Sequence, residues 1–203
     1  MPSGNKPPAA HSRVRQTDLA AHRADSPYSR GEQLARVAWG LLRPLYRFSP
    51  QPLHGWRRCL LRAFGARLAA DVYLHPSARV YFPWTLTCEA GAAIGENVLI
   101  YNLGPVHIGA RSMISLGSTV CAGSHDDANP AMPLLRSTIH IGDDVWVCAE
   151  VFVGPDTRIG AGAVLLPRAV VTRDVPEWTR VGGHPAKVIG PRVLDRASRA
   201  DVR

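Results

Sequence analysis

Residues 141–175, IGDDVWVCAEVFVGPDTRIGAGAVLLPRAVVTRDV, carry an aliphatic side chain at every sixth position. These aliphatic residues are Ile141, Val147, Val153, Ile159, Leu165 and Val171. The fourth residue after each is small or β-branched, namely Val145, Val151, Thr157, Ala163, Ala169 and Val175. A six-residue period is typical of a parallel β-helix, in which the aliphatic side chain points inward and stacks on its counterparts in neighbouring coils. The stretch therefore predicts an all-β solenoid.

The same register extends toward the N-terminus. Six-residue steps join Ile108, Ile114 and Val120, then Cys88, Ile94 and Ile100, and finally Leu74 and Val80. The steps from Val80 to Cys88 and from Ile100 to Ile108 are eight residues long, which indicates an insertion in each. With three faces to a coil, these positions predict nearly five coils, stacked at about 4.8 Å.

The rest of the chain predicts three further segments. Residues 1–30 are rich in Pro, Ser, Ala and Arg without a period, and we expect a flexible tail. Residues 31–70 predict a basic helical segment, with helices over 31–47 and 55–64 that pack on the main domain. The apolar residues at helical spacing in the first helix are Leu34, Val37, Ala38, Leu41, Leu42 and Leu45, and Pro44 is expected to end its regular part. The solenoid is expected over 71–178, with a loop at 126–140, and a C-terminal segment over 179–203.

The net charge of +8 is concentrated near the helices. Between Arg30 and Arg67 there are eight arginines and one acid, Glu32. Such a surface suits phosphates, acidic glycans or anionic lipid. Nucleic acid is not predicted as a partner, because no aromatic-plus-basic binding motif accompanies the charge.

Several features predict a cytoplasmic protein. No apolar run approaches the roughly 18 residues of a membrane-spanning helix, and the N-terminus lacks the apolar region of a secretory signal. The four cysteines, Cys59, Cys88, Cys121 and Cys148, stand far apart, so reduced thiols are expected and no metal site is predicted.

Two roles stay open for the basic segment 31–67. In the first, its arginines and the aromatic residues Trp39, Tyr46 and Trp56 recruit the protein to the inner membrane surface. In the second, Trp56 and Leu60 cap the first coil of the solenoid.

The repeat is interrupted between Val120 and Ile141 by more than one hexapeptide allows. Loops on rigid scaffolds often carry function, and this one contains His125. An imidazole titrates near neutrality and can serve as a general base. The alternative is an exposed loop histidine without a role.

The hexapeptide array, the loop Ser124-His125-Asp126 and the end Gly182-Gly183-His184-Pro185-Ala186-Lys187-Val188-Ile189 resemble the hexapeptide-repeat acetyltransferases. Within them, the segments 49–58, 82–84 and 100–103 look like the colanic acid biosynthesis acetyltransferase type. The resemblance implies a left-handed β-helix and a homotrimer with active sites between subunits. It also implies acetyl-CoA as donor, a sugar or glycan hydroxyl as acceptor, and a place in exopolysaccharide biosynthesis.

The resemblance also implies roles for individual residues. His125 matches the catalytic histidine, which takes the proton of the acceptor hydroxyl while backbone N–H groups hold the oxyanion. The acceptor-binding residues are expected to be Asn102 and Asp126. The alternatives are a turn-forming role for Asn102, and for Asp126 either a role in orienting the His125 ring or a solvated carboxylate. The residues expected to bind acetyl-CoA are Trp146 and Ala149 at the pantetheine arm, Pro167 and Thr172 further along, and Arg173, Lys187 and Arg192 at the phosphates.

Rival functions exist within the same fold. A zinc enzyme of the γ-carbonic anhydrase type needs three histidines, two of them closely spaced, and no two histidines here lie within ten residues. An acyl-enzyme on Cys121 is a second rival, although Cys121 follows an inward-facing Val120. A catalytically silent trimeric scaffold is a third. Other acetyltransferases of this fold use serine, antibiotics or nucleotide-sugars, and the sequence does not name the acceptor.

Overall fold

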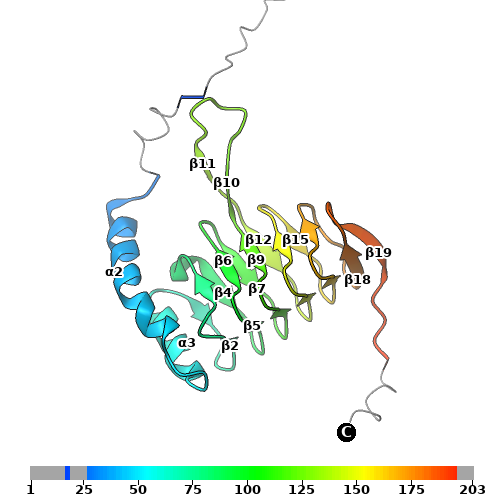
Figure 1. Ribbon diagram of the computed structural model, residues 1–203, viewed down its shortest axis with the longest axis horizontal. Coiled ribbons are helices and arrows are strands. Elements are labelled where there is room, and N and C mark those ends of the chain that lie inside the picture. Colours follow the sequence, from blue (N-terminus) through cyan, green and yellow to red (C-terminus); the bar gives the residue numbers. More distant parts are fainter. Residues whose placement is uncertain (1–16, 19–26, 196–203) are drawn as a thin grey trace, which may run out of the picture.

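The computed structural model describes residues 17–18 and 27–195 and consists of a β-solenoid with two helices at its N-terminal end (Figure 1). The helices are α2 (Arg30–Arg47) and α3 (His54–Ala63). One sheet of the solenoid contains β1 (Arg67–Leu68), β4 (Leu86–Cys88), β7 (Val106–Ile108), β12 (Ile139–Ile141) and β15 (Arg158–Ile159). The second contains β2 (Tyr73–Leu74), β5 (Ala93–Ile94), β8 (Met113–Ile114), β13 (Trp146–Val147), β16 (Val164–Leu165), β18 (Thr179–Gly182) and β19 (Lys187–Pro191). The third contains β3 (Arg79–Val80), β6 (Leu99–Tyr101), β9 (Thr119–Cys121), β14 (Phe152–Val153) and β17 (Val170–Val171).

The six-residue period predicted the interior of this solenoid correctly. The inward residues of the final coils, Ile141, Val147, Val153, Ile159, Leu165 and Val171, are each at most 1% exposed. Strands of successive coils pair in parallel, so that Val147 lies beside Leu165 and Val153 beside Val171. The coils therefore share one continuous apolar core, and the prediction of an all-β parallel β-helix is confirmed.

The solenoid extends beyond its predicted boundaries at both ends. Leu68 in β1 lies one hexapeptide before Leu74 and pairs with Cys88 of the next coil. At the other end β18 pairs in parallel with β16, and β19 folds back antiparallel onto β18. Within the described residues the strands therefore make five complete coils and part of a sixth, rather than nearly five.

The helices cap the first coil, as one of the two sequence hypotheses proposed. Leu60 is buried as expected, but Trp56 is 43% exposed, and Trp39 and Tyr46 make the hydrogen bonds to the coil. The Trp39 indole donates a hydrogen bond to the Val80 carbonyl at 3.1 Å, and the Tyr46 hydroxyl donates to the His75 carbonyl at 3.1 Å. Both aromatic side chains are at most 4% exposed, and burial raises the pKa of Tyr46. The expectation that Trp39 and Tyr46 form an exposed aromatic surface is therefore wrong.

Two further expectations about α2 are corrected. Pro44 lies inside the helix, which continues to Arg47. The predicted packing stripe is exposed, and includes Leu34 and Leu41 at 72% and 75%. The reason is that Trp39 and Tyr46 pack on the coil and also satisfy its free carbonyl groups, which leucines cannot do.

Arg57 of α3 belongs to the interior and not to the basic surface. Its guanidinium is fully buried and donates to the carbonyls of Leu74 and Pro50, both at 2.8 Å, and to the Ser49 hydroxyl at 2.9 Å. Burial lowers the pKa of this guanidinium. Arg57 therefore joins the turn before α3 to the first coil.

Candidate active site

The interruption of the repeat is a β-hairpin that stands out from the solenoid (Figure 1). It consists of β10 (Gly123–His125) and β11 (Leu134–Arg136), paired antiparallel with His125 opposite Leu134. The hairpin begins at Gly123, where a Cβ atom would come within 2.7 Å of Leu103 Cδ1. Glycine allows this close departure from the coil. The solenoid thus positions the base of the hairpin by direct packing.

The hairpin holds the His125 ring through its own backbone. His125 Nδ1 lies 2.8 Å from the Met132 carbonyl oxygen. Because a carbonyl oxygen only accepts, Nδ1 carries the hydrogen in this bond, and Nε2 is then the nitrogen that accepts a proton. His125 is exposed on the hairpin. This is the tautomer that a general base requires.

The Asp126 carboxylate braces the turn at the hairpin tip. Its Oδ1 accepts a hydrogen bond from the Ala128 backbone N–H at 3.1 Å, while the Asp126 N–H donates to the Pro133 carbonyl at 3.1 Å. The His125 ring is oriented instead by its hydrogen bond to the Met132 carbonyl. Asp126 keeps partial exposure, so its predicted contact with the acceptor stays a prediction.

Asn102 has the turn-forming position that was the alternative to acceptor binding. Its side chain is fully buried, and Oδ1 accepts from the backbone N–H groups of Tyr81 and Phe82, each at 3.1 Å. Its amide nitrogen donates to the Phe82 carbonyl and to the Thr85 hydroxyl. All hydrogen-bonding positions of the amide are thus used inside the protein. The geometry makes Asn102 a residue that fixes the turn 81–85, and we do not retain it as an acceptor ligand.

A cluster that the sequence did not predict attaches the hairpin to α2. Arg136 of β11 makes an ion pair with Glu32 at 2.7 Å and donates to the Pro27 carbonyl at 2.8 Å. Its guanidinium also lies 4.9 Å from the centre of the Tyr28 ring. On the helix side, Arg36 lies 3.9 Å from the same ring. We call Tyr28, Glu32, Arg36 and Arg136 the hairpin clamp.

The electrostatics of the clamp follow from this ion pair. The hydrogen bond from Arg136 holds the pKa of the Glu32 carboxyl below its ordinary value. Glu32 also completes a capping box with Ser29 at the start of α2. The box was visible in the sequence as Ser29-x-x-Glu32, but nothing in the sequence relates it to Arg136, 104 residues later.

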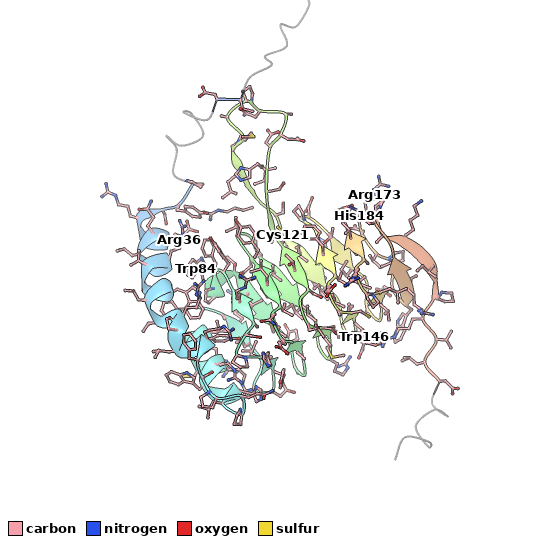
Figure 2. All side chains as sticks on the ribbon, in the orientation of Figure 1. Arg36, Trp84, Cys121, Trp146, Arg173 and His184 are labelled. Carbon is pink, nitrogen blue, oxygen red and sulfur yellow. The ribbon has the colours of Figure 1, made fainter. Side chains whose placement is uncertain are left out.

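Three of the predicted CoA residues gather at the C-terminal end of the solenoid. Thr172, Arg173 and Lys187 line a cavity of about 210 Å³, together with Asp174. All three are exposed. Figure 2 shows Arg173 and His184 close together at this end of the molecule.

The remaining predicted CoA residues lie elsewhere. Trp146 projects from β13 with its Nε1 donating to the Ser115 hydroxyl at 3.1 Å, and lies on the opposite edge of the solenoid from Arg173 in Figure 2. Ala149 and Pro167 lie on turns of successive coils, where the Arg168 N–H donates to the Ala149 carbonyl at 3.0 Å. One chain therefore carries the predicted CoA residues in two separate groups.

Arg192 is held by the protein itself. Its Nη1 donates to the Asp144 carbonyl at 2.6 Å and to the Gly162 carbonyl at 2.9 Å. The guanidinium also lies 5.8 Å from the Trp178 ring centre. These contacts fasten the chain just after β19 to the solenoid, and the predicted phosphate contact of Arg192 stays a prediction.

The rival metal and thiol sites can be compared with the structure. His107 and His140 stack with ring centres 4.7 Å apart, although they are 33 residues apart in sequence, so sequence spacing alone did not reveal the pair. Desolvation and the neighbouring His107 lower the pKa of His140. No group of three or more His, Cys, Asp or Glu residues suited to a metal occurs in residues 17–18 and 27–195.

Cys121, the candidate thiol nucleophile, is half-buried at the hairpin base, where its thiol donates to the Gly123 carbonyl at 3.3 Å.

Comparisons with known proteins agree with this geometry. No family model matches the sequence. The chain is 39% identical over 155 residues to a candidate colanic acid biosynthesis acetyltransferase, WcaF of Escherichia coli (strain K12), covering 76% of this chain and 85% of the relative. A chloramphenicol acetyltransferase of Klebsiella aerogenes is 49% identical, but over only 55 residues, 27% of this chain and 26% of the relative.

Two solved structures share the fold over more than four fifths of this chain. A hexapeptide-repeat acetyltransferase of Vibrio cholerae, in complex with acetyl-CoA, has a TM-score of 0.74 at 26% identity, covering 83% of this chain and 93% of that one. A maltose O-acetyltransferase of Clostridium difficile has a TM-score of 0.72 at 20% identity, covering 88% and 99%, and supports the fold alone. The solenoid and these relatives therefore define a hexapeptide-repeat acetyltransferase. Within that class, the chain belongs to the family of the colanic acid acetyltransferase WcaF, so the predicted family and the predicted acyltransferase class are confirmed.

Proposed function

We propose that the protein transfers an acetyl group from acetyl-CoA to a sugar hydroxyl, with His125 as general base. The observation that carries the proposal is the hydrogen bond of His125 Nδ1 to the Met132 carbonyl, because it leaves Nε2 as the basic nitrogen. The relatives support the substrates. The Vibrio cholerae structure contains acetyl-CoA, and WcaF is by name an acetyltransferase of colanic acid biosynthesis.

The chemistry is a direct transfer. His125 Nε2 takes the proton of the acceptor hydroxyl as its oxygen attacks the carbonyl carbon of the thioester. The tetrahedral oxyanion is held by backbone N–H groups, and the carbon–sulfur bond then breaks. The imidazolium returns the proton to the departing thiolate, so the products are an acetyl ester and free CoA.

The cavity near β17 and β19 fits the charged end of CoA. Arg173 and Lys187 are exposed cations on its lining, and Thr172 adds a hydroxyl donor. Phosphate groups suit such a site even though Asp174 contributes one opposing charge. In this proposal the three side chains hold the phosphates, while Trp146, Ala149 and Pro167 contact the pantetheine arm.

The separation of these two groups on one chain supports a homotrimer. A single CoA meets both groups if each site combines the cavity of one subunit with the Trp146 edge of a neighbour. We therefore expect a mass of about 66 kDa, three times the 22.0 kDa chain. Light scattering that finds a stable and fully active monomer would contradict this arrangement.

The acceptor we favour is a glycan of exopolysaccharide biosynthesis, modified in the cytoplasm or at the inner membrane surface. The similarity to WcaF spans most of the chain, whereas that to chloramphenicol acetyltransferase spans about a quarter. Serine, an antibiotic or a nucleotide-sugar is the alternative acceptor. A catalytically silent scaffold is the alternative role.

An acceptor screen tests the proposal. The protein is incubated with acetyl-CoA and with polysaccharide repeat units, maltose, serine or chloramphenicol, and the release of free CoA is measured. His140→Gln serves as a matched histidine control, since His140 is exposed on the sheet of β12, outside the proposed site. We expect release with a sugar acceptor by the wild type and the control, and loss with His125→Ala. Release that needs only serine or chloramphenicol would contradict the sugar assignment, and no release with any acceptor would favour the scaffold.

A further inference from the structure

The α2 helix has apolar side chains on two opposite faces. Trp39 and Tyr46 face the solenoid, as described above. The other face carries an exposed stripe of Leu34, Val37, Leu41 and Leu45, with exposures of 72%, 63%, 75% and 51%. At 100° per residue these four side chains lie within an arc of about 80°, opposite Trp39. Phe48, 82% exposed, continues the stripe just beyond the helix. We call these five residues the outer stripe.

A contiguous apolar surface of this kind is unusual on a soluble protein. Single exposed leucines are common, but an aligned series on one helix face marks a contact surface. The Trp56 indole of α3 extends the surface, since it is 43% exposed and donates to the Leu45 carbonyl at 3.1 Å. The apolar surface therefore continues beyond the outer stripe to an indole whose polar atom is already satisfied.

The charged residues of α2 nearest the outer stripe are arginines. At 100° per residue Arg30 lies within the arc of the stripe and Arg47 lies about 80° beyond its edge, whereas Arg43 lies on the opposite side, beside Trp39. Residues 33–67 contain no acid. Glu32, the only carboxylate between Arg30 and Arg67, is engaged by Arg136 of the hairpin clamp. An apolar face flanked by arginines is the pattern of a helix that lies in the interface of an anionic membrane. No helix in the described part of the chain is long and apolar enough to cross a membrane.

We propose that the outer stripe of α2 docks the protein onto the surface of an anionic lipid bilayer. The leucines enter the boundary between headgroups and acyl chains, and the arginines pair with the lipid phosphates. The proposal goes beyond acetyl transfer and does not depend on the role of His125. It also replaces the contact residues expected from the sequence, because two of the three predicted aromatics are buried in the cap.

Flotation of the full-length protein with lipid vesicles tests the proposal. The vesicles contain phosphatidylcholine alone or mixed with phosphatidylglycerol. We expect binding to the mixed vesicles at low salt, weaker binding at high salt and little binding to phosphatidylcholine. The double variant Leu34→Gln, Leu41→Gln should lower the affinity about 10-fold or more at any salt. The double variant Arg30→Gln, Arg47→Gln should lower it about 25-fold at low salt, or about 5-fold for each arginine.

A matched control lies at the other end of the solenoid. Val193 and Leu194 are also exposed, at 81% and 61%, so Val193→Gln, Leu194→Gln removes similar apolar surface without touching α2. This variant should bind vesicles like the wild type, and all variants should keep the wild-type melting temperature.

Failure of the wild-type protein to float with anionic vesicles would overturn the proposal. So would a fall in oligomer mass of the Leu34, Leu41 variant, because the stripe would then be a contact between subunits. Acetyl transfer to a soluble acceptor, measured in parallel, reports separately on the proposed reaction.

Discussion

The coils and the hairpin of this protein are positioned by different interactions. In the coils, each inward side chain stacks on residues of the neighbouring coils, so a period of six residues determines its position. In the hairpin, His125 is oriented by Met132, seven residues away, and the hairpin base is attached to α2 through Arg136 and Glu32, 104 residues apart. Stability is therefore concentrated in the repeating part, and the candidate chemistry lies in the part that breaks the repeat.

The largest expected loss of stability comes from a core variant. Ile141 is fully buried where the repeat resumes after the hairpin. Ile141→Ala should lower the free energy of unfolding by about 2–5 kcal/mol, through lost burial and a residual cavity. Denaturant unfolding at one fixed protein concentration measures this. Ile189→Ala, at a 61% exposed position, is the control and should change it by less than about 0.5 kcal/mol. Equal effects of the two variants would contradict the description of the core.

The next largest effect tests whether the Asn102 side chain stabilises the coil or binds the acceptor. Asn102→Ala leaves the Phe82 N–H without its acceptor, whereas the Tyr81 N–H keeps its hydrogen bond to the Ile100 carbonyl at 3.0 Å. A buried unsatisfied group costs about 1–3 kcal/mol, and we expect a loss of stability in this range. The KM for the acceptor should stay unchanged at a temperature where the variant is folded. A raised acceptor KM with an unchanged melting temperature would restore the acceptor-binding role.

A moderate effect is expected from loosening the hairpin clamp. Arg136→Ala removes the ion pair with Glu32 and the contact with Tyr28, so we expect kcat to fall about 10-fold as His125 loses its position. The pH profile of kcat should keep its shape, because the base itself is unchanged, and Arg136→Lys should restore part of the rate. Arg111→Ala is the control, since it removes a comparable 2.7 Å ion pair with Asp144 on the coils. An unchanged kcat in Arg136→Ala would show that the clamp does not position the site.

The smallest effect concerns pH. The pKa of Glu32 is lowered in the folded protein, so its ion pair contributes stability above the ordinary carboxyl pKa of 4.5 and loses it as pH falls through the folded pKa. At 26% exposure for Glu32 and 30% for Arg136, the pair is worth about 0.5–1 kcal/mol. Glu32→Gln keeps the capping geometry, so its stability should fall below the wild type by this amount above pH 5, with the difference shrinking in acid. A difference independent of pH would contradict the ion-pair account.

The sequence predicted the coils well because local spacing determines them. It missed Leu68 because a single two-residue strand before Leu74 adds only one more step to the register. The break at Val120 was visible, but the pairing of β10 with β11 and the clamp depend on contacts between distant segments. The stack of His107 on His140 was hidden for the same reason, since the coil register brings together residues 33 positions apart.

The helix α2 shows a second limit of sequence reasoning. Helical spacing correctly predicted an apolar stripe at Leu34, Leu41 and Leu45, but not which face would meet the solenoid. Trp39 and Tyr46 decide that question because each combines a large apolar surface with a donor for a coil carbonyl. For a helix with two apolar faces, the buried face is better assigned from the side chains that can donate hydrogen bonds to carbonyls of the neighbouring element.

The most direct test of the central claim is to measure kcat and the melting temperature of His125→Ala in the same preparation. If the hairpin carries the chemistry and the coils carry the stability, kcat with the identified acceptor falls about 10²–10⁴-fold. The melting temperature and the oligomer mass then stay at their wild-type values, because His125 is exposed and lies outside the coils. A variant that keeps more than half of the wild-type kcat would contradict the assignment of His125 as the base.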